Sequence, residues 1–340
     1  MQGIDSARVT SWLEANVAGA TAPFDFALIA GGRSNLTYAV TDGNDRRFVL
    51  RRPPLAQVLA TAHDMAREHR IISAVGRTDV PVPQALAVCT DVDVNGAAFY
   101  VMSYVDGVVL DSPERAAALP VALRPRVSEH LVDVLADLHA VDVDEVGLGD
   151  LAKREGYVER QVTRWSKQWD QSKTRELPEI DVVARKLREH LPVQQGVSIA
   201  HGDFRFGNCL TDVVDGRINA VLDWELCTLG DPLADLGYLG VYWYDGTAET
   251  VRANDPTSAG GFPTYVDLVE RYACRTGRDV SGIGYYIAFG CWRLAVISEG
   301  VYSRYVHGAM GDGGDLDVAT FKEATDSLAK RALEAIDQWG

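Results

Sequence analysis

Two short stretches in the middle of the chain carry the residue types that phosphoryl transfer requires. Asp203 and Asn208 are separated by four residues in the stretch HGDFRFGN, and Asp223 follows in the stretch VLDWE. An aspartate that accepts a hydroxyl proton, an asparagine that reaches a metal ion and a second aspartate between metal and phosphates form such a site. Mg²⁺ prefers oxygen ligands, usually one or two carboxylates with phosphates and water. The spacing predicts Asp203 as the catalytic base and Asn208 and Asp223 as ligands of Mg²⁺.

A turn between the two stretches strengthens this prediction. Taken alone, His-Gly-Asp is a common tripeptide, and an aspartate after a strand often caps a turn. Here Asp215-Gly216 separates two strand-like runs, at 209–213 and 217–222, which is a hairpin signal. A hairpin brings the two stretches that flank it close together. The combination favours a catalytic site over the two ordinary interpretations.

The elements that must position these residues change in character along the chain. Strand-like runs dominate up to about residue 105, and helical patterns dominate afterwards, with the hairpin as the one expected strand pair among them. The pattern predicts an α+β fold in which a strand-rich lobe is followed by a helix-rich lobe. The first five predicted strands cover residues 28–32, 36–40, 48–51, 85–89 and 97–104, with a helix at 61–75. The expected lobes are a nucleotide-binding lobe of residues 1–105 and a catalytic, acceptor-binding lobe of residues 106–340, with a hinge at about 103–107.

Composition argues against several classes of partner. The 340 residues include 48 Asp or Glu and 33 Lys or Arg, which gives a formal charge of -15. A chain so acidic repels a phosphate backbone, so we expect no nucleic-acid partner. We also expect no membrane partner, because no run is long and apolar enough to span a bilayer and no secretory signal is recognisable. Five cysteines without CxxC spacing indicate free thiols, so we expect a cytoplasmic location.

The two stretches also resemble those of a known family. HGDFRFGN and VLDWELCTLGDPLADLGYL are similar to motifs of the aminoglycoside phosphotransferase and choline kinase-like family, whereas the loop of protein kinases begins His-Arg-Asp. One branch of the family includes the kinase-like domains of acyl-CoA dehydrogenase family proteins and bacterial proteins assigned to the aminoglycoside phosphotransferases. The segments that resemble this branch are 48–54, 63–75, 136–148, 157–169 and 289–304. The resemblance covers nearly the whole chain. It implies an α+β, protein-kinase-like bilobal fold that binds ATP between its lobes and uses Mg²⁺.

The resemblance further implies which residues bind the nucleotide. A loop between the first two strands covers the phosphates, because glycines let backbone N–H groups approach them closely. The phosphate contacts are implied for Gly32, Ser34 and Asn35. The adenine contacts are implied for the backbone of Ser103 and Val105, with Met102 packed nearby. A pair of glycines alone is more often part of an ordinary turn.

One departure from the kinase pattern lies in the third strand. Kinases carry a lysine there, paired with a glutamate on the next helix, whereas this chain has Arg51 and Glu68. Arginine is always charged and binds phosphate bidentately, so Arg51 can replace the lysine. Arg52 is a competing candidate for the phosphate contact, and a solvated helix face is the ordinary alternative for Glu68. We expect His201 to brace the catalytic loop.

The sequence therefore predicts an ATP-dependent O-phosphotransferase that acts on a hydroxyl group of a small molecule. An aminoglycoside-like acceptor fits the family and a hydroxyacyl acceptor fits the branch, and the residues leave this choice open. The alternative is a nucleotide-binding regulatory module that has lost catalysis, since Arg51 replaces the usual lysine. The intact Asp203, Asn208 and Asp223 favour an active enzyme.

Overall fold

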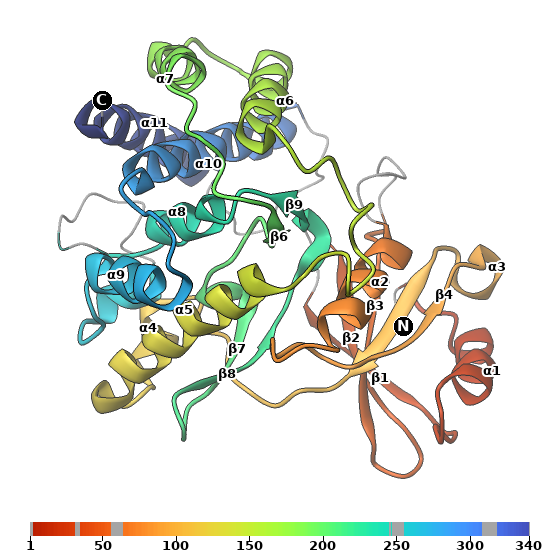
Figure 1. The fold of residues 1–340 in the computed structure, drawn as a ribbon. Helices are drawn as coiled ribbons and strands as arrows, with labels where there is room; N and C mark the ends of the chain where they lie inside the picture. Colours follow the sequence, from red (N-terminus) through yellow and green to blue (C-terminus); the bar gives the residue numbers. More distant parts are fainter. Residues whose placement is uncertain are drawn as a thin grey trace.

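A five-stranded antiparallel sheet forms the N-terminal part of the chain (Figure 1). In spatial order β1-β2-β3-β5-β4, its strands are β1 (Asp25–Ala30), β2 (Leu36–Thr41), β3 (Arg47–Arg52), β4 (Ala85–Cys89) and β5 (Phe99–Ser103). The accompanying helices are α1 (Ser6–Asn16), α2 (Met65–Val75) and α3 (Val92–Asn95). Because α2 lies between β3 and β4 in the sequence, the predicted order of three strands, a helix and two strands is confirmed.

The computed structural model describes residues 3–30, 35–55, 64–244, 246, 255–307 and 318–339. Residues 61–63, where we expect the helix of the first lobe to begin, lie outside these ranges. Among the described residues, no helix combines the length and the apolar character that crossing a membrane would need.

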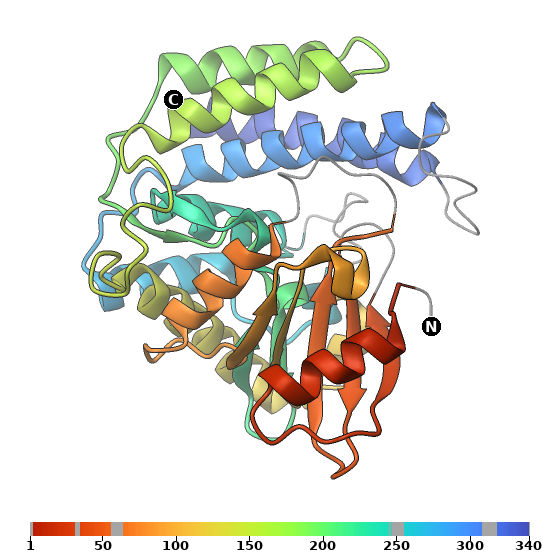
Figure 2. The same cartoon turned by 90° about the vertical axis from the view of Figure 1, so that its right-hand side faces the viewer.

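The two faces of the sheet pack against different elements because side chains alternate along each strand. Phe48 and Leu50 of β3 belong to an apolar cluster with residues of α1. Val49 points to the opposite face and belongs to the large cluster that includes α2 and the helical part of the chain. Figure 2 shows α1, in red, lying across the outer face of the sheet. Along β3, Arg51 therefore points towards the rest of the molecule and Arg52 points towards α1.

Helices make up most of the second part of the chain, as the sequence predicts. Their bounds are α4 (Pro113–Ala117), α5 (Arg124–Ala140), α6 (Tyr157–Ser172), α7 (Pro178–Glu189), α8 (Leu233–Val241), α9 (Tyr265–Thr276), α10 (Ile283–Val306) and α11 (Ala319–Trp339). Short 3₁₀ turns include η1 (Val121–Leu123) and η5 (Pro256–Ala259). Helix α10 packs along α11 and against α8. Figures 1 and 2 both show the green helices α6 and α7 over the blue pair α10 and α11.

Two short strand pairs hold the segments that carry the predicted catalytic residues. The strands are β6 (Ser198–Ala200), β7 (Cys209–Asp212), β8 (Arg217–Val221) and β9 (Thr228–Gly230). The β7–β8 hairpin forms as predicted, but β6 also pairs with β9, so the expectation of a single strand pair is wrong. Strands of three residues are too short to show an alternating pattern. Residues 201–208 run from β6 to β7 and residues 222–227 run from β8 to β9, so each segment is fixed at both ends.

Candidate active site

The backbone of the predicted catalytic loop, residues 201–208, is held by a buried carboxylate. Asp235 of α8 is 1% exposed and accepts hydrogen bonds from the backbone N–H groups of His201 at 2.6 Å and Gly202 at 2.8 Å. Gly202 has φ 85°, and a Cβ at this position would lie 2.8 Å from the carbonyl oxygen of Leu226. The loop therefore requires glycine directly before Asp203.

The structure brings Asp203 and Asn208 into direct contact. The 3₁₀ turn η2 (Phe206–Asn208) folds the loop back, and Asn208 Nδ2 donates to the backbone oxygen of Asp203 at 2.8 Å and to its Oδ2 at 2.7 Å. Arg205 Nε donates to the other carboxylate oxygen, Oδ1, at 3.2 Å. Because the amide nitrogen of Asn208 is directed at Asp203, its Oδ1 is the atom left to bind a cation.

Asp223 follows β8 in a backbone conformation that is rare for residues other than glycine. Its φ and ψ are 66° and 64°, in the left-handed region, which costs about 1–2 kcal/mol and is common at functional sites. The neighbouring Leu222 donates its N–H to the Asn208 carbonyl at 2.8 Å, and its own carbonyl lies 2.9 Å from His201 Nε2. These contacts tie Asp223 to the catalytic loop and place His201 as a brace between the two segments.

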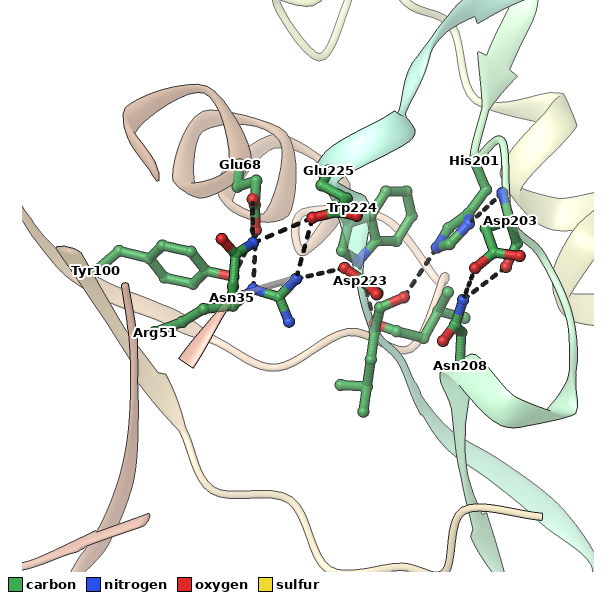
Figure 3. Close-up of polar contacts among 12 residues, drawn as sticks. Asn35, Arg51, Glu68, Tyr100, His201, Asp203, Asn208, Asp223, Trp224 and Glu225 are labelled. Carbon is green, nitrogen blue, oxygen red and sulfur yellow. Dashed lines mark hydrogen bonds and ion pairs between the residues drawn. The ribbon is translucent and has the colours of Figure 1, made fainter. Parts of the chain in front are cut away.

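Arg51 lies among three carboxylates (Figure 3). Its Nε is 3.2 Å from Glu68 Oε2, and its Nη2 donates to Asp223 Oδ1 and lies 3.9 Å from Glu225 Oε2. Glu68 is 2% exposed, so the alternative that it lies on a solvated helix face is wrong. Burial raises the pKa of Glu68 to about 7, against the lowering effect of Arg51 and with further raising by Asp223 and Glu225. One guanidinium therefore faces an excess of negative charge.

Two features of this cluster fit a divalent cation bound together with phosphates. First, the excess negative charge is one that a cation would neutralise. Second, Asn35 Nδ2 donates to Glu68 and Glu225, each at 3.2 Å, while its buried Oδ1 has no partner among the described residues. Within the described ranges no three His, Cys, Asp or Glu side chains form a ready-made metal cage. Mg²⁺ held by phosphates, water and one or two carboxylates needs no such cage.

The other residues predicted to bind the nucleotide differ in their placement. Met102 is 7% exposed and packs in the cluster on the α2 face of the sheet. The N–H of Ser103 already donates to the Gln84 carbonyl at 2.8 Å, so its carbonyl is the group left for a ligand. Val105 follows the sheet and is half-buried. Of the three residues predicted to contact the phosphates, Gly32 and Ser34 lie outside the described ranges.

Arg52 lies away from this cluster. Its Nη1 donates to the carbonyl oxygens of Gly3 and, at 3.2 Å, Asn95, both on the α1 side of the sheet. The Arg51 guanidinium lies on the other side, against Glu68. Of the two candidates that the sequence leaves open, Arg51 is the one whose side chain the fold directs to the predicted catalytic residues.

Two arginines near Asp203 are absent from the sequence predictions. Arg205 lines a cavity of about 150 Å³ whose walls are mainly apolar, including Leu110, Phe206, Leu239 and Leu294. Arg293 Nη2 donates to the carbonyl of Gly202, 91 residues away in the sequence. The position of Arg205, two residues after the predicted base, was a signal that sequence reasoning could have used. Arg293 comes from α10, and no local pattern marks it.

Comparisons with known proteins agree with this geometry. Residues 25–266 match the model of the phosphotransferase enzyme family. Acyl-CoA dehydrogenase family member 10 of Mus musculus is 34% identical over 319 residues, which make up 92% of this chain and 29% of that protein. This chain thus spans less than a third of the length of that curated relative.

Solved structures show the same fold. A provisionally assigned aminoglycoside phosphotransferase of Ralstonia eutropha superposes with a TM-score of 0.83 at 32% identity, over 98% of both chains. An aminoglycoside phosphotransferase in a ternary complex with ADP and hygromycin B superposes with a TM-score of 0.60 at 16% identity, over 95% of this chain and 98% of the other. The predicted α+β, kinase-like bilobal fold is confirmed. Together with the family match over most of its length, these similarities show that the chain belongs to the phosphotransferase enzyme family.

Proposed function

We propose that this phosphotransferase moves the γ-phosphoryl group of ATP to a hydroxyl group of a small molecule, with Asp203 as base and with Asn208 and Asp223 as ligands of Mg²⁺. One observation carries the proposal: two strand pairs hold the segments with these three residues side by side, and a carboxylate-rich cluster around Arg51 adjoins them. An accidental cluster would not need the rare backbone conformation of Asp223 or the glycine at 202.

Each residue has a task that its contacts support. Asn208 and Arg205 hold the two carboxylate oxygens of Asp203, so that the carboxylate is oriented to accept the proton of an acceptor hydroxyl. Arg51 is held between Glu68 and Asp223, on the side of the sheet where the phosphates would bind. Bound Mg-ATP supplies the phosphoryl group, and the metal neutralises phosphate charge. The carbonyl of Ser103 and the backbone of Val105 would bind the adenine edge.

The cavity beside Arg205 favours a hydroxyacyl acceptor over an aminoglycoside-like one. Its walls are mainly apolar, and one of the residues that line it is Arg205, the partner of Asp203. Two acidic residues also line it, but Asp111 pairs with Arg115 and Asp255 accepts the N–H of Thr257. A polycationic aminosugar would therefore meet a like charge and few unpaired carboxylates, whereas a hydrocarbon chain with a hydroxyl fits.

The substitution Asp203→Asn tests the proposed function. Phosphoryl transfer should fall at least about a hundredfold, because the amide cannot accept the proton. Mg-ATP affinity should stay within about twofold, since Asp203 is not placed on the nucleotide phosphates. Transfer is measured as Mg²⁺-dependent ADP release with a panel of hydroxy acids, hydroxyacyl thioesters and aminoglycosides, and affinity is measured by calorimetry.

The matched control is Asp215→Asn, in the exposed turn of the β7–β8 hairpin, which should leave both measurements unchanged. Full transfer activity in Asp203→Asn would remove Asp203 from the role of base. Wild-type protein that binds Mg-ATP yet transfers to none of the acceptors, nor to water, would favour the regulatory module instead.

A further inference from the structure

Arg205 is held in one position from three sides. Its Nε donates to Asp203 Oδ1 at 3.2 Å, and its guanidinium carbon lies 5.0 Å from the ring centroid of Tyr242. On a third side it packs against the backbone of Gly207, where an added Cβ would collide with Nη1 and lie 3.0 Å from Cζ. Glycine at 207 therefore makes room for the guanidinium, and the charged group has little freedom to move.

The terminal nitrogens of this guanidinium still have hydrogen-bonding capacity. Among the described residues, neither Nη1 nor Nη2 of Arg205 donates to a protein acceptor, although the side chain is only 29% exposed. Burial works to lower the pKa of Arg205, but the Asp203 carboxylate and the nearby tyrosines raise it above its ordinary value, so the group stays charged. A fixed, charged donor group that lines a cavity beside the proposed base indicates an anionic ligand.

The anion within reach of these nitrogens follows from the proposed reaction. An acceptor oxygen lies about 3 Å from the carboxylate that takes its proton, and the phosphorus lies about 3 Å further. Arg205 already touches that carboxylate through Nε, so its terminal nitrogens are within a few ångströms of the path that the phosphoryl group would take. We propose that Arg205 binds the phosphoryl group in transit and is a catalytic residue, an arginine supplied by the chain itself.

The reaction step is balanced without a further reactant. The bond from the γ-phosphorus to the oxygen shared with the β-phosphate breaks, and its electron pair stays on ADP. A bond from the acceptor oxygen to phosphorus forms, and the acceptor proton passes to Asp203. The N–H groups of Arg205 donate to the non-bridging phosphoryl oxygens, as arginines do in other phosphoryl-transfer sites. Arg293 cannot take this part, because it is 5% exposed and bound to the Gly202 carbonyl.

The test distinguishes two roles for Arg205: binding the phosphoryl group, or only positioning Asp203. The proposal rests on the proposed function. Affinity for Mg-ADP is measured by calorimetry with and without aluminium fluoride, which mimics the phosphoryl group in transit, first without any acceptor and then in a second series with a hydroxy acid as anionic acceptor. We expect aluminium fluoride to strengthen ADP binding in the wild type. In Arg205→Gln, this increase in ADP affinity should be at least about tenfold smaller. Affinity for Mg-ADP alone should change less than about twofold. Transfer should fall at least about a hundredfold and recover in part when methylguanidine is added.

Two further variants keep the test independent of folding defects. Gly207→Ala retains the guanidinium but displaces it, so it should lose a smaller part of the fluoride-dependent gain than Arg205→Gln. Arg275→Gln removes an arginine that is bound to Asp137 on the surface, and it should lose none. Thermal melting identifies any variant that is not folded. The fluoride-dependent gain in the variants that do fold then decides whether Arg205 binds the phosphoryl group.

Two results would overturn the assignment. If Arg205→Gln keeps the full fluoride-dependent gain while transfer falls, Arg205 only positions Asp203. If the gain is lost only when an anionic acceptor is present, Arg205 binds the acceptor and not the phosphoryl group. Failure of the proposed function looks different, because the wild-type protein itself would then show neither transfer nor a fluoride-dependent gain.

Discussion

The two ends of the candidate active site differ in their balance of charge. Around Arg51, one guanidinium meets the carboxylates of Glu68, Asp223 and Glu225. Around Asp203, one carboxylate meets Arg205 directly, and Arg293 binds the adjoining Gly202 carbonyl. Carboxylates outnumber guanidinium groups three to one around Arg51, whereas Asp203 has a guanidinium partner of its own in Arg205.

This difference in charge balance indicates which ligand each end is suited to bind. Around Arg51, burial raises the pKa of Glu68 to about 7, against the lowering effect of Arg51 and with smaller raising effects of Asp223 and Glu225. The carboxylate excess at this end suits a divalent cation. The guanidinium near Asp203 suits the anion that the cation helps to neutralise. A phosphoryl group that passes from one end to the other would thus keep a positive partner throughout its path.

The largest expected effect comes from Asp223→Asn. Asparagine tolerates the left-handed conformation of this residue, so the backbone should be kept while the charge is lost. Transfer should fall at least about a hundredfold. The strengthening of ATP binding by Mg²⁺ should also disappear, because the proposed metal ligand is gone. Calorimetric titration of ATP in Mg²⁺ and in EDTA measures this difference.

Asp203→Asn serves as the matched variant from the other end of the site. It should lose transfer to a similar degree and keep the Mg²⁺-dependent part of the ATP affinity. If both variants lose the Mg²⁺-dependent part of the ATP affinity equally, metal binding is not confined to the Asp223 end as the charges indicate. If Asp223→Asn retains it, Asp223 is not the metal ligand.

The next effect in size concerns the two neighbouring arginines of β3. Arg51→Met leaves three carboxylates without their guanidinium, so the free energy of unfolding should fall by about 3 kcal/mol and ATP affinity should fall with it. Arg52→Met removes the donor to the part-buried carbonyl of Gly3 and the buried carbonyl of Asn95, so it should destabilise by about 1–3 kcal/mol without changing ATP affinity. Urea denaturation and ATP titration measure the two quantities separately.

Addition of Mg²⁺ sharpens this comparison. The metal should restore part of the stability lost in Arg51→Met, because a cation replaces the missing positive charge, and it should not help Arg52→Met. Equal losses of ATP affinity in both variants would contradict the assignment of Arg51 to the nucleotide side of the sheet.

The fold could be predicted where the pattern is local. Alternating runs and the turn at Asp215-Gly216 marked the first sheet and the β7–β8 hairpin, and the structure confirms both. The β6–β9 pair could not be predicted, because strands of three residues at a separation of about 30 leave no periodic signal. Such pairs form only when the rest of the chain brings the two segments together.

Part of the candidate site could be predicted from the sequence for the same reason. Asp203, Asn208 and Asp223 lie at short spacing, so the sequence alone singles them out. The choice between Arg51 and Arg52 was not readable, because Phe48, Val49 and Leu50 are all apolar and do not show which face of the strand is turned to α1. Placement of α1 on one face settles the orientation. The predicted lobe boundary near residues 103–107 stays a prediction.

The smallest expected effect is a pH dependence that comes from Glu68. Its pKa of about 7 in the folded protein lies above its ordinary value of 4.5, because burial disfavours the charged form more than Arg51 favours it. The folded protein thus keeps a proton on Glu68 that the unfolded chain releases. The stability gained from this proton is complete below pH 4.5 and is lost as the pH rises through about 7.

Glu68→Gln should remove this dependence, since glutamine resembles the protonated acid at every pH. We expect the variant and the wild type to differ little in unfolding free energy near pH 5, and the variant to be more stable by on the order of 2 kcal/mol at pH 8. Urea denaturation at intervals between pH 5 and 8.5 measures the difference, with Glu270→Gln, on an exposed position of α9, as the matched control. A difference that does not change with pH would show that the pKa of Glu68 is not raised in the folded protein. The contrast between the two ends of the site would then rest on geometry alone.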